Sequence, residues 1–406
     1  MIFRMPTAIS RFASLNTFLE THQAFWQFLP FDTLSLPWQT QSPDLCAWLS
    51  SLSLAELHSY KNNPIALAEK VAAWLPALKG YQALCHVQPA NKTFLPFDFR
   101  LEQGIPGRKK QQIDHFNAAL PIASEPTHWL EWCAGKGYLG RAIAATRDAK
   151  VTSLEWQQTL CEEGQAFAHK HELNMHYVHA NAFAESSTAL VKACDHAIAL
   201  HACGELHIHL LKTAVANQTN AITISPCCYH LIKNQTYQPL SKAGQASSLV
   251  LFQQDLKLPL QETVTAGKSV QNMRFIEVAF RLGFDKLQRE IFQQASYLPL
   301  PNIQKSQLKL GFKAFCLWAG EQKGLQLPKN VDFARFEQEG QQRFLLVERM
   351  ETLRTLFRRP LELWLSYDKI LFLIENNYSA TLSEFCERKL TPRNLLISTH
   401  LSSYHH

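Results

Sequence analysis

The feature that most constrains the fold is a long run of residues in which short apolar segments alternate with amphipathic helical ones. A helical stretch follows each of the first four apolar segments after a short connection. Such alternation is typical of βαβ units, whose parallel sheet is covered by helices on both faces. The predicted fold class is therefore α/β with a Rossmann-like sheet. The strands are expected at residues 128–133, 151–156, 175–179, 195–202 and 221–225.

The segments that flank this run predict the domain organisation. Residues 1–103 are rich in aromatic residues and helical apolar spacing, and are expected to form a mainly helical accessory domain. Residues 104–406 are expected to form the second domain, with its core at 126–230 and about 360–400. Between these parts, residues 231 to about 345 are less regular and predict a helical insertion before the last strands.

The end of the chain combines a basic helical stretch with two predicted strands. Residues 343–372 favour one or two helices that are interrupted at Pro360. Arginines on such a stretch indicate either a solvated helix face or contacts with phosphate. Residues 380–401 predict two strands around a turn at 390–394, and these would complete the same sheet. The arginines concerned are Arg349, Arg354, Arg358 and Arg359.

Composition excludes several classes of protein. A hydrophobic fraction of 46% and a charged fraction of 18% are incompatible with general disorder. Ten cysteines in 406 residues are too few for a disulfide scaffold, and no apolar run is long enough to predict a membrane span. The first ten residues lack the apolar region of a signal peptide, so a cytoplasmic location is expected. The net charge of +6 permits a polyanionic partner; the oligomeric state is not predicted.

A glycine-rich turn predicts a nucleoside-binding site. Gly135, Gly137 and Gly140 follow the first strand and precede a helix, where glycine permits positive φ and the helix start offers free N–H groups. Glu155 ends the second strand, where its carboxylate could accept hydrogen bonds from both ribose hydroxyls. Asn181 follows the third strand and could reach an adenine amino group, although an asparagine there could equally cap a helix.

Two nucleoside cofactors fit this turn. The glycines match the dinucleotide fingerprint G-x-G-x-x-G, which is typical of proteins that bind NAD. Glu131 stands four positions before Gly135, and this E-x-x-x-G-x-G form resembles motif I of class I methyltransferases. The acidic residue favours S-adenosylmethionine over NAD.

Two clusters of cysteine and histidine follow the fourth and fifth strands. The first is the segment His-Ala-Cys-Gly, which contains His201 and Cys203. The second is Ser-Pro-Cys-Cys-Tyr-His, which contains Cys227, Cys228 and Tyr229. Because ligands of open α/β sheets bind at the carboxyl ends of the strands, we expect both clusters to face one crevice.

These motifs together resemble a group within the class I methyltransferases. The group includes relatives of the glutathione S-transferase C-terminal-domain-containing protein and proteins described as ribosomal RNA adenine dimethylase domain-containing. It is more distantly similar to eukaryotic tRNA ribose methyltransferases that carry an H-x-C-G element. The resemblance covers residues 104–230 and 360–400. It rests on the segments WCAGKGYLG, ALHACGE, SPCCYH, GRKKQQID at 107–114 and LTPRNLLI at 390–397.

The resemblance implies a class I methyltransferase sheet, S-adenosylmethionine as cofactor and roles for individual residues. His201 and Cys203 would line the methyl-transfer cleft, with Cys227 and Tyr229 opposite. RNA is the favoured acceptor, a protein side chain is an alternative, and a noncatalytic cofactor-binding assembly factor is a third possibility. Asn181 stands where an acid is more common in the family. The cofactor would be bound by Glu131, Gly135, Gly137, Glu155, Asn181 and His201.

The chemistry of the clusters leaves several roles open. His201 or His230 could act as a general base, or be a buried structural histidine. Cys203, Cys227 and Cys228 could ligate zinc, but their spacing is not C-x-x-C and adjacent cysteines rarely both ligate one ion, so no metal is predicted. The ordinary role of such thiols is to pack tightly around the cofactor. A Pro-Cys element is also typical of covalent cytosine methylation, yet its partner Pro-Cys is missing here. Basic residues at 108–110 could contact a carboxylate or phosphate, or form a solvated loop.

Overall fold

The computed structural model describes residues 7–122, 127–147, 149–261 and 268–402, and it divides into two compact units. Unit 1 comprises the described parts of Met1–Glu20, Leu84–Leu260 and Arg359–His406, and unit 2 comprises Thr21–Ala83 and the described part of Gln261–Arg358. This division does not follow the domain boundary expected at residue 103.

The difference arises because spatial contacts, and not chain order, define the units. The first hundred residues contribute to both units, and residues 231–260 of the expected insertion lie in unit 1. Residue 126, the expected start of the core, lies outside the described residues.

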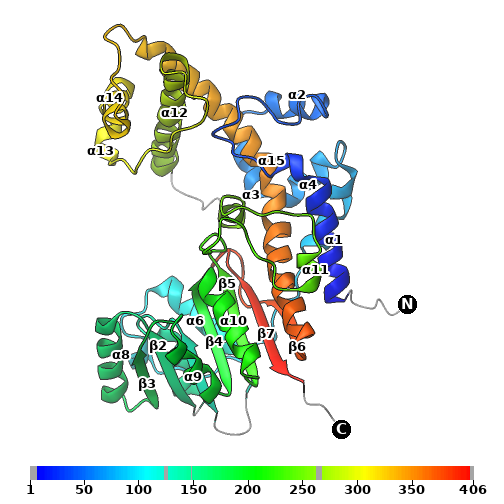
Figure 1. Cartoon of the computed structure of the whole chain (residues 1–406), viewed down its shortest axis with the longest axis vertical. Coiled ribbons are helices and arrows are strands. Elements are labelled where there is room, and N and C mark those ends of the chain that lie inside the picture. Colours follow the sequence, from blue (N-terminus) through cyan, green and yellow to red (C-terminus); the bar gives the residue numbers. More distant parts are fainter. Residues whose placement is uncertain (1–6, 123–126, 148, 262–267, 403–406) are drawn as a thin grey trace. The chain divides into compact units, whose positions relative to one another are not determined.

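Unit 1 is built on a seven-stranded sheet with the order β3-β2-β1-β4-β5-β7-β6 (Figure 1). The first five strands are parallel, whereas β7 pairs antiparallel with both β5 and β6. The predicted Rossmann-like α/β sheet is confirmed, including the two last strands. The strands are β1 (His128–Trp132), β2 (Lys150–Glu155), β3 (Met175–His179), β4 (His196–Cys203), β5 (Ala221–Cys227), β6 (Tyr378–Glu384) and β7 (Leu395–Leu401).

Helices cover both faces of the sheet because its inner strands are apolar on both sides. One core joins Ile113 and Ile143, from helices on the first face, to Val151 of β2. A separate core joins Leu210, from a helix on the second face, to Ile222 of β5. The first face carries α6 (Gly107–Ala119), α7 (Tyr138–Thr146) and α8 (Gln158–Lys170); the second carries α9 (Glu185–Ala193), α10 (Glu205–Ala216) and the end of α15 (Phe333–Glu375) (Figure 1).

The helix α15 is continuous, so the predicted interruption at Pro360 is wrong. Proline lacks one backbone donor and normally kinks a helix. Here the residues on both sides of Pro360 are fully buried, among them Phe357 and Leu361. Tertiary packing therefore stabilises the helix through a position that local propensity disfavours.

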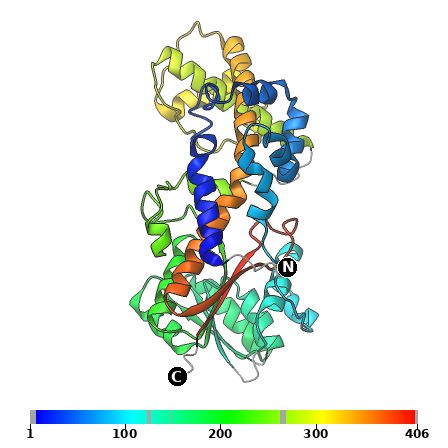
Figure 2. The ribbon, with the colours of Figure 1, turned by 90° about the vertical axis from the view of Figure 1, so that its right-hand side faces the viewer.

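The last part of α15 packs on α1 (Ala8–Thr21) within unit 1, and Figure 2 shows the two helices side by side. The ring centroids of Phe12 and Trp364 lie 5.2 Å apart. The indole N–H of Trp364 donates a hydrogen bond of 2.9 Å to Oδ1 of Asn16. The first residues of the chain thus help to cover the sheet domain.

Three of the four arginines considered on α15, Arg354, Arg358 and Arg359, are buried, so neither a solvated face nor a phosphate site describes them. The fourth, Arg349, is partly buried and donates to the carbonyl oxygens of Leu49 and Ser50. In unit 1, Arg359 forms an ion pair of 2.6 Å with Glu362 and a second pair with Glu384. In unit 2, Arg354 donates to the carbonyl oxygen of Trp26. Because buried charges are costly without partners, these side chains serve packing and hydrogen bonding.

Unit 2 is helical. Lys61 and Glu348 form a buried ion pair of 2.5 Å, and Phe284 and Phe336 belong to an aromatic core. No helix in the described part of the chain is both long and apolar enough to cross a bilayer. Unit 2 contains η1 (Gln23–Phe25), α2 (Pro43–Ser51), α3 (Leu54–Asn62), α4 (Pro64–Val71), η2 (Pro76–Gly80), α12 (Lys268–Ile291), α13 (Lys305–Leu308) and α14 (Phe312–Lys323); α5 (Tyr81–Cys85) joins it to unit 1. The short helices η3 (Phe99–Glu102), α11 (Lys242–Gln245) and η4 (Asp255–Leu260) belong to unit 1.

Two buried histidines predict a loss of stability in acid. Burial lowers the pKa values of His196 and His207 to about 3, so both imidazoles stay neutral in the fold. The unfolded chain binds these protons below about pH 6.5, and the native chain does not. Between about pH 6.5 and 3 the free energy of unfolding should therefore fall, by at most about 1.4 kcal/mol per pH unit for each histidine.

Urea denaturation at several pH values measures this slope. The variant His196→Gln should flatten the slope relative to the wild type. The exposed His176, on β3, provides the matched control, and His176→Gln should leave the slope unchanged. Equal slopes for His196→Gln and the wild type would contradict the assignment.

Candidate functional site

The order of the strands gathers the predicted site residues at one edge of the sheet. β1 lies between β2 and β4, and all three run parallel, so their carboxyl ends meet. Cys203 at the end of β4 is in register with Cys227 at the end of β5. β2 and β4 lie on opposite sides of β1, so the strand order reverses there. Open α/β sheets bind ligands in the crevice at the carboxyl ends of the strands at such a point.

The turn after β1 has one open side and one closely packed side. Cys133, Gly135 and Gly137 all have positive φ, at 58°, 59° and 64°. A Cβ added to Gly135 would meet no atom within 4 Å, whereas one added to Gly137 would lie 1.7 Å from the hydroxyl oxygen of Tyr177. Gly135 therefore leaves its backbone accessible to a ligand, while Gly137 is required by the packing of the turn.

Glu155 joins the end of β2 to this turn. Its Oε2 accepts a hydrogen bond of 2.8 Å from the N–H of Gly135, and its Oε1 accepts one of 2.9 Å from the N–H of Gln157. An ionised carboxylate has about four acceptor sites, so two remain for further donors. The carboxylate is thus fixed in orientation and still able to accept from a diol.

An exposed tryptophan beside Glu155 was missed by sequence reasoning. Trp156 directly follows the acid, and 64% of it is exposed. A large apolar ring exposed next to a polar binding position is suited to stacking on a flat ligand. The signal was present in the sequence as an aromatic residue immediately after the acid that ends the second strand.

Glu131 supports the turn from its closely packed side. Its carboxylate is buried and accepts a hydrogen bond of 2.8 Å from the hydroxyl of Ser153. Burial raises its pKa to about 7, although Ser153, the N–H of Gly140 and nearby cations oppose the rise. A Cβ on Gly140 would lie 2.5 Å from this carboxylate. The acid four positions before Gly135 therefore packs against the first turn of α7.

Asn181 lies at the exposed end of β3 and forms a local turn. Its Oδ1 accepts a hydrogen bond of 3.0 Å from the N–H of Phe183, and its carbonyl oxygen accepts from the hydroxyl of Ser187. Phe183 is 37% exposed, and the ammonium of Lys233 lies 4.3 Å from its ring centroid. These contacts form a local turn ahead of α9, whose N-cap is Ala184, so Asn181 does not cap the helix and its position stays compatible with a ligand.

His201 is neutral in this environment. Burial lowers its pKa to about 4, and Lys109 and Arg393 add to the effect. Its Nε2 lies 3.1 Å from Oε1 of Gln112 on α6, and its φ of 74° turns the side chain toward that helix. Such an imidazole is a weak base, so orientation by hydrogen bonding suits it better than proton abstraction.

Three thiols gather at the ends of β4 and β5. The sulfur atoms of Cys203 and Cys227 are 3.5 Å apart, and Cys228 completes a group whose sulfurs all lie within 4.8 Å of one another. Hydrogen bonding with Cys227 lowers the pKa of the Cys228 thiol, and the Arg393 guanidinium acts in the same direction. All three are free thiols.

Tyr229 lies apart from the thiols in the interior. Only 3% of it is exposed, and the ammonium of Lys369 lies 5.4 Å from its ring centroid. Its ring also contacts His207 edge-on, with the centroids 6.2 Å apart. This position gives the tyrosine a packing role in the interior.

The basic residues before β1 have different surroundings. Lys110 forms ion pairs of 3.1 Å with Glu102 and 2.7 Å with Asp114. Lys109 lies over the ring of Tyr138, and burial lowers its pKa. Arg108, at the start of α6, is exposed. Of these three side chains, only that of Arg108 is as exposed as the prediction of a solvated loop requires.

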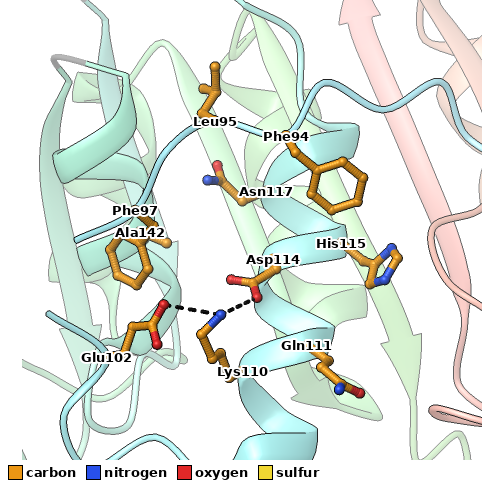
Figure 3. Close-up of a pocket in the computed structure, with 10 residues that line it drawn as sticks. All are labelled: Phe94, Leu95, Phe97, Glu102, Lys110, Gln111, Asp114, His115, Asn117 and Ala142. Carbon is orange, nitrogen blue, oxygen red and sulfur yellow. Dashed lines mark hydrogen bonds and ion pairs between the residues drawn. The ribbon is translucent and has the colours of Figure 1, made fainter. Parts of the chain in front are cut away.

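Two cavities lie away from the turn. Figure 3 shows the first, of about 240 Å³, beside α6, where Lys110 bridges Glu102 and Asp114. The second, of about 670 Å³, is lined by residues of α6 and of the strands, among them His196 and Thr223. Neither set of lining residues includes the glycine turn. The first cavity is lined by Phe94, Leu95, Phe97, Glu102, Lys110, Gln111, Asp114, His115, Asn117 and Ala142.

Comparison with known proteins points to one domain family. Residues 108–235, which include the glycine turn, Glu155 and the thiols, match the model of a family described as a methyltransferase domain. No curated protein matches the chain. The match supports the prediction of a methyltransferase, and the finer resemblance to the His-Ala-Cys-Gly and Pro-Cys-Cys-Tyr group stays a prediction.

Several solved structures are similar to part of this chain. TYW2 of Pyrococcus horikoshii, in complex with MeSAdo, is 16% identical over 32% of this chain and 44% of that chain, with a TM-score of 0.24. A SAM-dependent methyltransferase from Agrobacterium tumefaciens is 12% identical over 30% and 45%, with a TM-score of 0.24. A putative transferase from Pyrococcus horikoshii is 16% identical over 29% and 43%, with a TM-score of 0.24. The chain therefore spans less than half the length of each of these three structures.

The two glycines of the turn predict different mutational effects. Gly135→Ala meets no neighbour but adopts positive φ, so it should lower the free energy of unfolding by about 1–2 kcal/mol. Gly137→Ala carries the same strain and also collides with Tyr177, so it should cost about 1–3 kcal/mol more.

Urea denaturation of both variants gives this difference directly. Removing the colliding hydroxyl in the double variant Gly137→Ala, Tyr177→Phe should recover part of the lost stability. If Gly135→Ala proved as destabilising as Gly137→Ala, the proposed difference between the two faces of the turn would be excluded.

Proposed function

We propose that the chain is an S-adenosylmethionine-dependent methyltransferase. The observation that carries this proposal is the 2.8 Å hydrogen bond from the amide of Gly135, whose Cα side is open, to the fixed carboxylate of Glu155. It brings a turn open to a ligand beside an acceptor for ribose hydroxyls, at the carboxyl edge of a parallel sheet. The methyltransferase family match over residues 108–235 gives independent support.

The residues around the turn fit such a nucleoside. Glu155 keeps acceptor capacity for two hydroxyls, and Trp156 presents an exposed ring on which an adenine could stack. The start of α7 offers N–H groups to the carboxylate of an amino acid moiety. When bound, the cofactor supplies an electrophilic methyl group on a sulfonium.

The acceptor side of the cleft would be formed by the end of β4. His201 is neutral and held by Gln112, so it can orient an acceptor by a hydrogen bond. Cys203 is only partly buried and lies next to it. Methyl transfer is an in-line displacement, so alignment of donor and acceptor is the main task of these side chains.

RNA is the acceptor class that we propose. The net charge of +6 and the exposed cations Arg108, Lys136 and Lys233 in unit 1 support a polyanionic acceptor. Lys136 belongs to the glycine turn and Lys233 follows β5, so both border the strand ends. Arg354, Arg358 and Arg359 of α15 add nothing to this argument because they are buried. The test below has two alternative outcomes: methyl transfer to a protein, and cofactor binding without any transfer.

Calorimetry with S-adenosylmethionine and its demethylated product tests cofactor binding. The wild type should bind both, and Glu155→Gln should weaken binding by about 10- to 100-fold, because a charged acceptor of hydroxyl hydrogen bonds contributes about 1.5–3 kcal/mol. The exposed Glu162 on α8 gives the matched control, and Glu162→Gln should bind like the wild type. Absence of binding heat with the wild type would exclude the proposal.

A second experiment identifies the acceptor. Lysate from a strain that lacks this gene is incubated with the purified chain and methyl-labelled S-adenosylmethionine. We expect label that ribonuclease removes, and no such label with Glu155→Gln. Label that only protease removes would transfer the assignment to a protein acceptor, and no label despite cofactor binding would favour an assembly factor.

A further inference from the structure

The thiol cluster of Cys203, Cys227 and Cys228 has the composition and geometry of a metal site. Its three sulfur atoms lie within 4.8 Å of one another, and two of them are 3.5 Å apart. Cys227 is buried, and the other two are partly buried. Three thiols in one place are an unusual feature for a core, in which small apolar residues would pack equally well.

Local backbone geometry explains how these cysteines meet without a C-x-x-C spacing. β4 has an irregular register against β5 between Leu200 and Cys203, and His201 within it has positive φ. Such irregularities re-aim side chains at strand ends. Cys228 also has positive φ, at 46°, so it leaves the strand direction directly after Cys227. Adjacent cysteines can thereby contribute to one cluster.

The sulfur separations fit a tetrahedral thiophilic ion. Zinc binds thiolate at about 2.3 Å, which places two sulfurs of a tetrahedral site about 3.8 Å apart. The observed separations, from 3.5 Å to at most 4.8 Å, bracket this value. Side-chain rotations would bring all three sulfurs into range without movement of the strands.

His230, two residues after Cys228, offers a fourth ligand by rotation of its side chain, since its ring nitrogens lie outside the group whose ligand atoms are within 4.8 Å of one another. The Nδ1 atom of His230 is buried and has no hydrogen-bond partner among the described residues. His230 also lies close enough to Cys228 to act on it electrostatically. Because buried polar atoms are normally paired, an unpaired imidazole nitrogen beside three thiols has the properties of a ligand.

We propose that Cys203, Cys227, Cys228 and His230 bind one zinc ion. Three cysteines and one histidine form a closed tetrahedral set of the kind found in structural zinc sites. Each thiol releases its proton to solvent on binding, so the site carries one net negative charge. The guanidinium of Arg393, which interacts with Cys228, balances that charge.

The zinc ion would fix the ends of β4 and β5 beside the glycine turn. Cys133, two residues before Gly135, interacts electrostatically with Cys203. The metal site itself does not depend on the proposed function; only its role in shaping a methyl-transfer cleft rests on it. Loss of zinc should therefore affect the acceptor side of the cleft, including His201 between the two strand ends.

Metal analysis of the full chain tests the site. The chain is purified under reducing conditions after loading with Zn²⁺, loosely bound ion is removed with a weak chelator, and zinc per chain is measured by mass spectrometry. We expect one equivalent in the wild type and at least a tenfold lower content in Cys203→Ser and Cys228→Ser. Cys194→Ser, a buried thiol outside the cluster, is the matched control and should keep one equivalent.

Two further measurements make the result specific. Co²⁺ in place of Zn²⁺ should give a sulfur-to-metal charge-transfer band in the wild type that is weaker in Cys203→Ser. His230→Gln should weaken Zn²⁺ affinity at least tenfold. Circular dichroism shows whether each variant is folded, so a low zinc content in a folded Cys203→Ser protein supports the site.

Three results would overturn the zinc site. These are less than a tenth of an equivalent of zinc in the wild type, equal zinc in the wild type and in both serine variants, and a native intact mass two hydrogens lower that marks a disulfide within the cluster. Calorimetry with S-adenosylmethionine separates this failure from failure of the proposed function. If the chain binds zinc but not the cofactor, only the proposed function is excluded. If it binds the cofactor but not zinc, only the metal site is excluded.

Discussion

The parallel pairing of β1 with both β2 and β4 is the constraint on which the site depends. Parallel neighbours end at the same edge, so this pairing places the glycine turn, Glu155 and the thiols within one small region. These residues are far apart in the chain and carry no signal of their proximity beyond the strand pattern. If β1 lay at the edge of the sheet, the turn would have only one neighbouring strand, and Glu155 of β2 and Cys203 of β4 could not both lie beside it.

The turn after β1 shows how one short segment satisfies packing and binding together. Gly137 faces inward against Tyr177, and Gly140 makes room for the buried carboxylate of Glu131. Gly135 faces outward and leaves its backbone accessible. Gly135 and Gly137 both have positive φ, and the inward contacts of Gly137 hold the turn, so the outward position is presented in a fixed geometry.

Charge patterns were the least informative part of the sequence. A row of arginines on a helix normally indicates a solvated face, yet Arg354 and Arg359 lie inside their respective units and are paired with carboxylates or carbonyl oxygens. Whether a residue of a long helix is buried depends on the segments that pack around that part of the helix. Arginine tolerates such burial because its five donors can be satisfied by fixed acceptors.

The sequence by itself determined the five parallel strands, the two closing strands, the glycine turn and the position of Glu155, because each depends on local periodicity or on residues next to a strand end. The tertiary structure alone showed the burial of Tyr229, the 3.5 Å contact between two thiols whose common crevice the strand order predicts, the continuity of α15 through Pro360 and the division of the first hundred residues between two units. Those features depend on contacts between segments distant in the chain, whose free energy of burial outweighs local preference and leaves no periodic trace in the sequence.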